Sequence, residues 1–491
     1  MTAGRPDGRG APRAGRFRTL ALLWATLVAA LPIGTHAQPP PEAGTTQTPS
    51  APGSPSSGPP AQDATACPTG NDANAFVARP ARQAPLVWDF SWRGWDGLHV
   101  SLSRDLPRAQ RLPELPVFEA DRLRLAARVG GRVEVDAAVF STTGDLSGFE
   151  PGVELRRARI TVRGDAVVTL PFTYRVDLGY VPEKFTVTEA YVEVPDLPWI
   201  GSAKLGIFKP PLGLQVVTSS WAIPLMEIAA PLQALAPGSD PGIEIGRPYA
   251  GGRGTWSLGV YGDIGANNEY GNASRNFGNA VGRVTWLAVD RIDVDRPVAN
   301  TFLHLGLGAV AQYSPSGQVR YRSRPESYIA PYVIDTGTID ADRAVTVGAE
   351  AAWVRGRLSL QGEALRSTVD PAGGGRLSFG GAYALASWFL TNDSRPYDRK
   401  EGRMASLVPQ RAFAFGPEGG WGAVEAVARL SHTDLSDGPV QGSRLTMLMS
   451  SLNWYPQRHL RWMLDVGFGR VTGAAEDGRI AVIQTRIGID L

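Results

Sequence analysis

Residues 460–468 have the sequence LRWMLDVGF. Every second residue of this stretch, from Leu460 to Phe468, is apolar, and polar or small residues occupy most positions between them. Because successive side chains of an extended chain point to opposite sides, such a stretch forms a strand with one apolar and one polar face. These nine residues therefore predict a half-buried β-strand.

The same two-residue period extends from about residue 85 to the end of the chain. It is clearest in residues 133–139, 157–163, 172–180, 283–286, 358–363 and 483–491. Strands with one polar face are typical of antiparallel sheets, whereas the strands of parallel sheets are apolar on both faces. We therefore expect an all-β fold built from one large antiparallel sheet.

Two features indicate which face of this sheet is the inside. Aromatic residues recur near the expected strand ends, as they do at the two membrane–water interfaces of membrane barrels; they are Trp88, Trp92, Tyr180, Trp199, Trp256, Trp286, Trp388, Trp454 and Trp462. The polar face often carries an arginine with a carboxylate nearby, which suits a water-filled lumen. Both features favour a closed transmembrane β-barrel over a soluble sandwich, in which the same aromatic residues would pack a core.

The length of the periodic region sets the size of the barrel. Spanning strands with alternating short turns and longer loops use roughly 25 residues each, so residues 85–491 predict about 16 strands. A barrel of this size leaves an aqueous channel, whereas an eight-stranded barrel is filled by its own side chains. We therefore expect solutes to pass through it.

The first 84 residues differ from the rest of the chain. Residues 1–37 contain five arginines, then an apolar run over residues 20–33 and small residues at Thr35 and Ala37, which is the pattern of a secretory signal peptide. The apolar run is shorter than the roughly 20 residues of a membrane-spanning helix. Residues 38–84 are rich in Pro, Ser and Ala and predict a disordered spacer.

Composition excludes several classes of protein. The only cysteine, Cys67, cannot form an intrachain disulfide or a cysteine-based metal site. The chain has a net charge of +2, and because five arginines and Asp7 give residues 1–37 a charge of +4, the remainder carries −2. Such a charge gives no reason to expect a nucleic-acid partner. The histidines beyond the signal are isolated from one another, so we expect neither a metal site nor a cofactor.

Several short motifs occur in one order between residues 155 and 456. They are LRRAR (155–159), TEAYVE (188–193), LGIFKP (205–210), TSS (218–220), GRVTW (282–286), RSRPE (322–326), SWFLT (387–391), SRPYDR (394–399), DLSDG (434–438) and LNWYP (452–456). Through these motifs the sequence resembles the phosphate-selective porin O and P family over roughly residues 120–491. The resemblance implies a sixteen-stranded outer-membrane barrel, usually trimeric, that passes small anions. It also implies a ladder of arginines in the lumen and lysines at the constriction.

The implied ladder has candidates in this chain. Guanidinium groups stay charged and match the oxygens of phosphate, so a file of arginines suits anion passage. The pore-lining candidates are Arg157, Arg159, Arg163, Arg175 and Arg283, a second group with two-residue spacing at Arg320, Arg322 and Arg324, and Lys209. The alternative is that these arginines form wall-stiffening ion pairs with acidic residues on neighbouring strands, such as Glu134, Asp136, Asp177, Glu189 and Glu193.

Residues 209–246 form the longest stretch without clean alternation. A loop of this length in a barrel often folds inward and narrows the lumen, although it could also cover the outside or contact another subunit. The constriction candidates are Thr218, Ser219, Ser220 and Trp221. In the family a basic residue commonly follows this Thr-Ser-Ser run, and here Trp221 follows. The chain has only four lysines, so phosphate specificity is not inferred.

Together these observations predict a porin of the outer membrane. We expect passive diffusion of small anions, with phosphate and polyphosphate as candidate solutes, and no enzymatic activity. The expected partners are outer-membrane lipid and lipopolysaccharide, the barrel-assembly machinery and two further copies in a homotrimer. The alternatives are a phospholipase- or protease-like barrel enzyme, which needs His432 or His304 beside a Ser or Asp, and a secreted β-sandwich binding protein.

Overall fold

The structure is a computed structural model of the chain. It describes residues 87–92, 98–105, 122–167, 170–181, 184–262, 273–275, 278–293, 297–416, 419–473 and 477–491. The expected signal peptide (1–37), the spacer (38–84) and Cys67 lie outside these residues. Almost all regular structure in the described part is β-strand.

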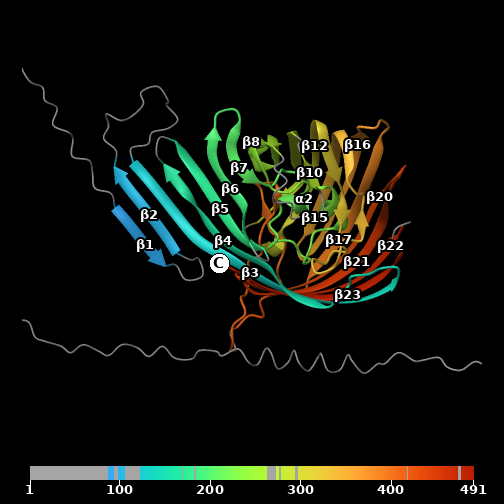
Figure 1. The fold of residues 1–491 in the computed structure, drawn as a ribbon. Coiled ribbons are helices and arrows are strands. Elements are labelled where there is room, and N and C mark those ends of the chain that lie inside the picture. The colour runs from blue at the N-terminus through green and yellow to red at the C-terminus, as the bar shows by residue number, and fades with distance from the viewer. Residues whose placement is uncertain are drawn as a thin grey trace, which may run out of the picture. The chain divides into compact units, whose positions relative to one another are not determined.

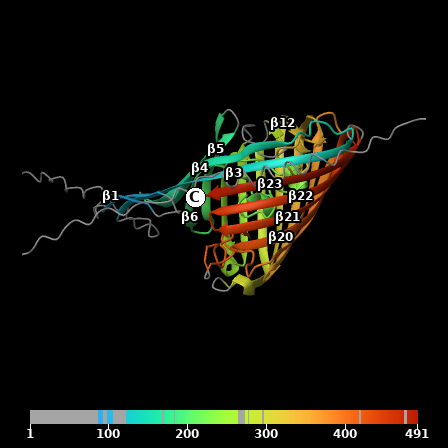
Figure 2. The ribbon, with the colours of Figure 1, turned by 90° about the horizontal axis from the view of Figure 1, so that it is seen from below.

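Sixteen antiparallel strands close into a ring, as the sequence predicts (Figures 1 and 2). In order they are β3 (Arg122–Gly144), β4 (Gly152–Val167), β5 (Pro171–Val181), β6 (Lys184–Leu197), β7 (Gly201–Phe208), β8 (Asp240–Tyr249), β9 (Gly254–Gly262), β11 (Gly278–Arg291), β12 (Thr301–Arg320), β15 (Ile339–Arg355), β16 (Leu358–Pro371), β17 (Leu377–Phe389), β20 (Ala423–Asp437), β21 (Val440–Gln457), β22 (Leu460–Thr472) and β23 (Gly478–Asp490). Pairing of β23 with β3 closes the ring.

The apolar residues of these strands face outward and the polar residues face the lumen. On β9, Leu258 and Val260 are 55% and 61% exposed, and the alternate residue Thr255 is buried. On β22, which contains residues 460–468, Arg461 and Asp465 point inward and are fully buried. This inversion relative to a soluble sandwich confirms the expected membrane barrel.

Short additional strands extend the sheet beyond the ring. The strands β1 (Val87–Trp92) and β2 (Leu98–Asp105) form a hairpin, and β2 pairs with the first residues of β3, which continue past the end of β23 (Figure 1). The strand β10 (Ala273–Arg275) pairs with the end of β12.

The two rims of the barrel differ in their connections. We call the rim that holds the end of β23 and the C-terminus the C-terminal rim, and the other the opposite rim. Most connections at the C-terminal rim are short, for example residues 356–357 and 458–459, but residues 390–422 are an exception. Two long connections, residues 209–239 and 321–338, leave from the opposite rim.

The long connections contain short elements. These are α2 (Leu214–Val217) and α3 (Ala230–Leu235), the paired strands β13 (Arg322–Ser323) and β14 (Ile334–Asp335), and the paired strands β18 (Tyr397–Asp398) and β19 (Arg403–Met404); the turns elsewhere include the 3-10 helices η3 (Ala250–Gly252) and η4 (Pro297–Ala299). No helix in the described part of the chain has the length and apolar character needed to span a bilayer.

Replacing Leu258 with Arg should lower the free energy of unfolding in lipid vesicles by about 2–4 kcal/mol, because the charge would face hydrocarbon. The matched variant Ser257→Arg places the same side chain on the neighbouring, lumen-facing position and should cost much less. Urea titration in vesicles, followed by the heat-modifiable migration of the folded barrel on a gel, measures both variants. Equal losses of stability would contradict the assignment of the two faces.

Candidate functional site

Residues 209–239, which join β7 to β8, lie inside the ring. Most of this inward segment is buried, and α3 packs against β16, β17 and β20, which lie far from it in sequence. The stretch expected to be irregular extended to residue 246, but β8 begins at Asp240, because residues 240–246 pair with β7 and residues 242–246 also pair with β9. The segment therefore enters and leaves on the side of β7 and β8 and crosses the lumen.

Carboxylates on the far wall accept hydrogen bonds from the backbone of the inward segment. Glu363 accepts from the N–H groups of Leu214 and Gln215 at 2.6 and 2.8 Å. Gly213 precedes this contact with φ at +87°, and a Cβ atom there would lie 2.5 Å from Glu363 Oε2. Only glycine allows the chain to approach the carboxylate so closely.

Donors on the wall bind the carbonyl groups of the same segment. Arg461 Nη1 donates to the carbonyl oxygen of Trp221 at 2.9 Å, and Asn453 Nδ2 donates to that of Pro224 at 2.7 Å. Each buried peptide group bound in this way avoids the cost of an unsatisfied polar atom, about 1–3 kcal/mol. The segment is therefore a fixed part of the lumen.

Glu227 is the charged anchor of the segment. Its carboxylate accepts from Arg156 Nε at 2.8 Å and from Arg486 Nη2 at 2.7 Å. Burial alone would raise the pKa of this carboxyl, but Arg156, Arg486 and Arg157 outweigh burial and hold the pKa at about 2. Glu227 is therefore ionised at neutral pH and joined to the wall by two guanidinium groups.

A second segment enters the lumen from the C-terminal rim. It is the first part of residues 390–422, where Arg395 Nη1 donates to the carbonyl of Ala222 at 2.8 Å and Arg403 Nη1 donates to the carbonyl of Val217 at 2.9 Å. Both acceptors belong to the inward segment. The two segments thus meet inside the barrel from opposite rims.

The hairpin of β13 and β14 contributes a third contact. Its Glu326 accepts from the N–H of Ala230 at 3.0 Å and from Arg429 Nη2 of β20 at 2.6 Å. Glu326 and Arg429 are both buried. The hairpin therefore ties the inward segment to the wall from the side of the opposite rim.

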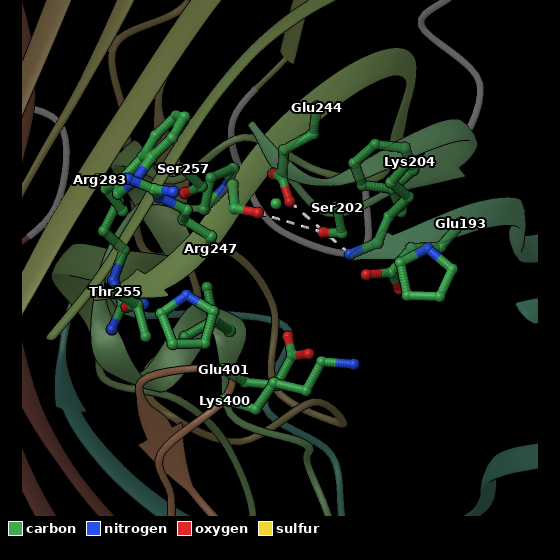
Figure 3. A pocket seen from close by; sticks show the side chains of 18 of the residues that line it. Glu193, Ser202, Lys204, Glu244, Arg247, Thr255, Ser257, Arg283, Lys400 and Glu401 are labelled. Carbon is green, nitrogen blue, oxygen red and sulfur yellow. Dashed lines mark hydrogen bonds and ion pairs between the residues drawn. The ribbon is translucent and has the colours of Figure 1, made fainter. Parts of the chain in front are cut away.

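These segments leave a cavity of about 480 Å³ against the wall formed by β6, β7, β8 and β9 (Figure 3). Its basic lining residues are Lys204, Lys209, Arg247, Arg283, Lys400 and Arg403, and its acidic lining residues are Glu189, Glu193, Asp196, Glu244 and Glu401. Most come from lumen-facing positions of the strands, and Lys400, Glu401 and Arg403 come from the second segment. The cavity is thus a charged, water-accessible part of the lumen.

The sequence matches the family of phosphate-selective porins O and P over residues 127–487. The chain belongs to this family. It is accordingly a porin, and its place is the outer membrane. A curated relative from Caulobacter vibrioides is 27% identical over 379 residues, which cover 73% of each chain.

Solved structures of outer-membrane channels resemble the porin at low sequence identity. The outer membrane channel DcaP of Acinetobacter baumannii has 7% identity and a TM-score of 0.48, with 75% of this chain and 97% of that chain covered. An anion-selective porin from Comamonas acidovorans has 12% identity and a TM-score of 0.47, with 75% and 100% covered.

At least four of the nine pore-lining candidates form ion pairs with carboxylates in the described part of the chain. The pairs are Arg157 with Glu134 at 2.7 Å, Arg175 with Asp177 at 2.7 Å, Arg283 with Glu350 at 2.6 Å, and Arg320 with Asp335. Two of these acids, Glu134 and Asp177, are among those that the sequence analysis named as alternatives. The charges of these four arginines are therefore largely compensated within the wall or the hairpin.

The other five candidates lie in different surroundings. Arg159 is half-buried on β4 and Arg163 is exposed near its end. The guanidinium groups of Arg322 and Arg324 lie over the ring of Tyr332 at 4.0 and 4.5 Å. Lys209 lines the cavity, together with Arg283 from the first group. The anion-binding role of all nine stays a prediction.

The four constriction candidates belong to the inward segment, and two of them, Ser220 and Trp221, contact β3, β22 and β23. Trp221 is buried beneath the Arg461 guanidinium, 4.6 Å from the ring centre, and Ser220 Oγ accepts from Arg132 at 2.9 Å. Thr218 is buried and Ser219 is exposed. None of the four lines the cavity, and the charged residues that do line it come from other parts of the chain.

The histidines that an enzyme would need have other surroundings. His432 faces outward and its Nδ1 contacts Thr446 Oγ1 at 2.8 Å. His304 is buried between Tyr397 Oη at 2.7 Å and Glu350 Oε1 at 2.9 Å. In the described residues no hydrogen bond joins either imidazole to a Ser or an Asp, and no group of three or more metal-binding side chains occurs there.

The sequence did not indicate several of the residues that line the cavity. Lys204 and Arg247 lie on short strands whose alternation is weak, and Lys400 and Arg403 lie in a segment that the sequence gives no reason to place in the lumen. The lack of alternation in residues 390–422 is a signal for a long connection. Only its contacts with the inward segment show that this connection enters the lumen.

Ionised Glu227 should keep the inward segment in place at neutral pH. Because its pKa in the folded barrel, about 2, is below the ordinary 4.5, its contribution is complete above about pH 4.5 and is lost as the pH falls toward 2. Single-channel current should be steady down to about pH 4 and become noisy near pH 2.

The variant Glu227→Gln should show that noise already at neutral pH, since breaking a buried ion pair costs about 3 kcal/mol. The control Asp370→Asn removes a carboxylate from an exposed ion pair and should leave the current steady. A quiet Glu227→Gln channel would contradict the anchoring role.

Proposed function

We propose that this porin passes small solutes by passive diffusion and favours anions over cations. The observation that carries the proposal is the lining of the cavity, where six basic side chains gather, including three of the four lysines of the chain. Basic groups around a narrow, partly dehydrated path raise the local concentration of anions. A lysine and arginine lining therefore supports anion preference.

The hairpin of β13 and β14 supplies a second basic surface toward the opposite rim. The Arg322 and Arg324 guanidinium groups stack on tyrosine rings, and neither forms an ion pair with a described carboxylate. Stacking holds a guanidinium group in place while leaving its charge uncompensated. We propose that these two arginines meet anions before the cavity does, and that the arginine-lined part of the path is here.

The same lining argues against a binding site dedicated to phosphate. Five acidic side chains share the cavity with the six basic ones. A group with two negative charges is repelled by such carboxylates more strongly than chloride is. We therefore propose general permeability to small anions, with phosphate and polyphosphate as solutes and not as specific ligands.

The assembly of this porin is inferred from its family. We propose a homotrimer in outer-membrane lipid and lipopolysaccharide, inserted by the barrel-assembly machinery after export. The outward leucine and valine residues of the sixteen strands suit the lipid contact. Native mass spectrometry of the purified porin tests the trimer.

In a planar bilayer under a potassium chloride gradient, the reversal potential should show that chloride permeates faster than potassium. The double variant Lys209→Gln with Lys400→Gln should lower the chloride-to-potassium permeability ratio severalfold, because it removes two positive charges from the cavity. The control Arg376→Gln with Arg470→Gln removes two exposed charges outside it and should change the ratio little. Cation preference of the unaltered porin would overturn the proposal.

Added phosphate should leave the chloride current nearly unchanged at millimolar concentration, since the cavity carboxylates oppose tight binding of a divalent anion. Current measured with and without phosphate on one side of the bilayer tests this. Block at micromolar phosphate would contradict the general character of the path and indicate a specific phosphate site.

A further inference from the structure

The cavity has an acidic side that a path for simple anions does not need. Glu193 of β6 and Glu244 of β8 lie beside the ammonium group of Lys204, and Glu401 of the second segment lines the same cavity. Lys204 Nζ lies 3.7 Å from Glu244 Oε1, and Glu193 and Glu401 also act on it electrostatically. Two carboxylates beside one ammonium leave this side with a net negative charge.

Two arginines that border the cavity offer little free charge to a solute. Figure 3 shows Arg247 and Arg283 on one side, together with Thr255 and Ser257, and the group of Glu193, Glu244 and Lys204 on the other. Arg283 is compensated, because it donates to Glu350 at 2.6 Å and to the carbonyl of Gly402 at 2.7 Å. Arg247 also borders the cavity, but it pairs with Trp256 on the face that carries Ile243 and Leu258, so its side chain leaves the strand on the outward side of the wall.

The second segment adds one residue of each sign. Lys400 and Glu401 both line the cavity, and Figure 3 shows them side by side at its edge. Within the described chain, neither side chain forms a hydrogen bond or an ion pair, and the same holds for Glu193. Opposite charges are therefore available to a solute at the same level of the path.

We propose that, among small solutes with an anionic group, the cavity prefers those that also carry an ammonium group, such as amino acids and other zwitterions. The anionic end of such a solute contacts Lys400, and its ammonium end contacts Glu193 and Glu401. This inference rests on the proposed function, because it takes the cavity as the diffusion path, and it deepens that function by naming the solute class.

The physical reason is the different cost of dehydration. A solute with both charges replaces water at each end with a protein group of opposite sign, whereas a simple anion of the same size gains only at its anionic end. One additional contact in a wet cavity is worth about 1 kcal/mol at most, which corresponds to about fivefold in rate or affinity. A cavity of about 480 Å³ has room for molecules of this size but not for their complete first water shell.

Taurine and 1-propanesulfonate test the proposal, because they have the same number of heavy atoms and differ only in an ammonium in place of a methyl group. Both keep the sulfonate ionised. Initial uptake into vesicles that contain the full porin, measured by mass spectrometry and divided by uptake into empty vesicles, should be about fivefold faster for taurine.

The double variant Glu193→Gln with Glu401→Gln should bring the ratio of the two rates to about one, by slowing taurine while 1-propanesulfonate keeps or gains speed. The matched control Asp370→Asn with Asp477→Asn removes two carboxylates of exposed ion pairs away from the cavity and should keep the preference for taurine. Heat-modifiable migration on a gel verifies that each variant is folded.

The outcomes separate the two proposals. Chloride-selective channels with equal uptake of the two sulfonates, or with a preference that the double variant retains, would overturn the zwitterion inference alone. Absence of conductance or cation selectivity would overturn the proposed function as well. Faster taurine uptake that disappears in the double variant and persists in the control supports both.

Discussion

Every backbone N–H and C=O group that enters hydrocarbon must find its partner within the protein, because no water is available there. For a sheet, this constraint is met only when the last strand pairs with the first. Residues of β23 from Gly478 to Asp490 pair with β3 over its residues 132–144, and this contact completes the ring. The outward apolar residues and the wet, charged lumen of the described barrel follow from that closure.

Closure creates an interior in which many charges are buried, and buried charges are tolerated only when they are paired. The lumen meets this requirement by pairing wall residues with each other and with the inward segments. Arg486 joins Asp136 of the wall at 2.7 Å and Glu227 of the inward segment at 2.7 Å. Most of the interior is therefore a compensated network that holds the segments, and it contributes little net field.

The charges left for solutes lie where the network is incomplete. Beside β6 to β9 the segments leave a cavity, and the side chains of Lys400, Glu193 and Glu401 line it without a hydrogen bond or ion pair to a described residue. Membership of the phosphate-selective porin O and P family thus fixes the barrel, while the selectivity of this porin depends on which of its charged side chains remain uncompensated. Family resemblance at an arginine such as Arg157 does not show whether its charge is available, because Glu134 lies 2.7 Å away.

The amino-acid sequence by itself determined the wall of this barrel. A two-residue period is a local property, so the strands, their outward and inward faces and the count of sixteen follow from neighbouring residues. The tertiary structure decided what fills the lumen and which charges remain. Those outcomes depend on contacts between residues far apart in the chain, such as Glu363 with the backbone of Leu214 and Arg395 with that of Ala222, and no local pattern encodes such pairings.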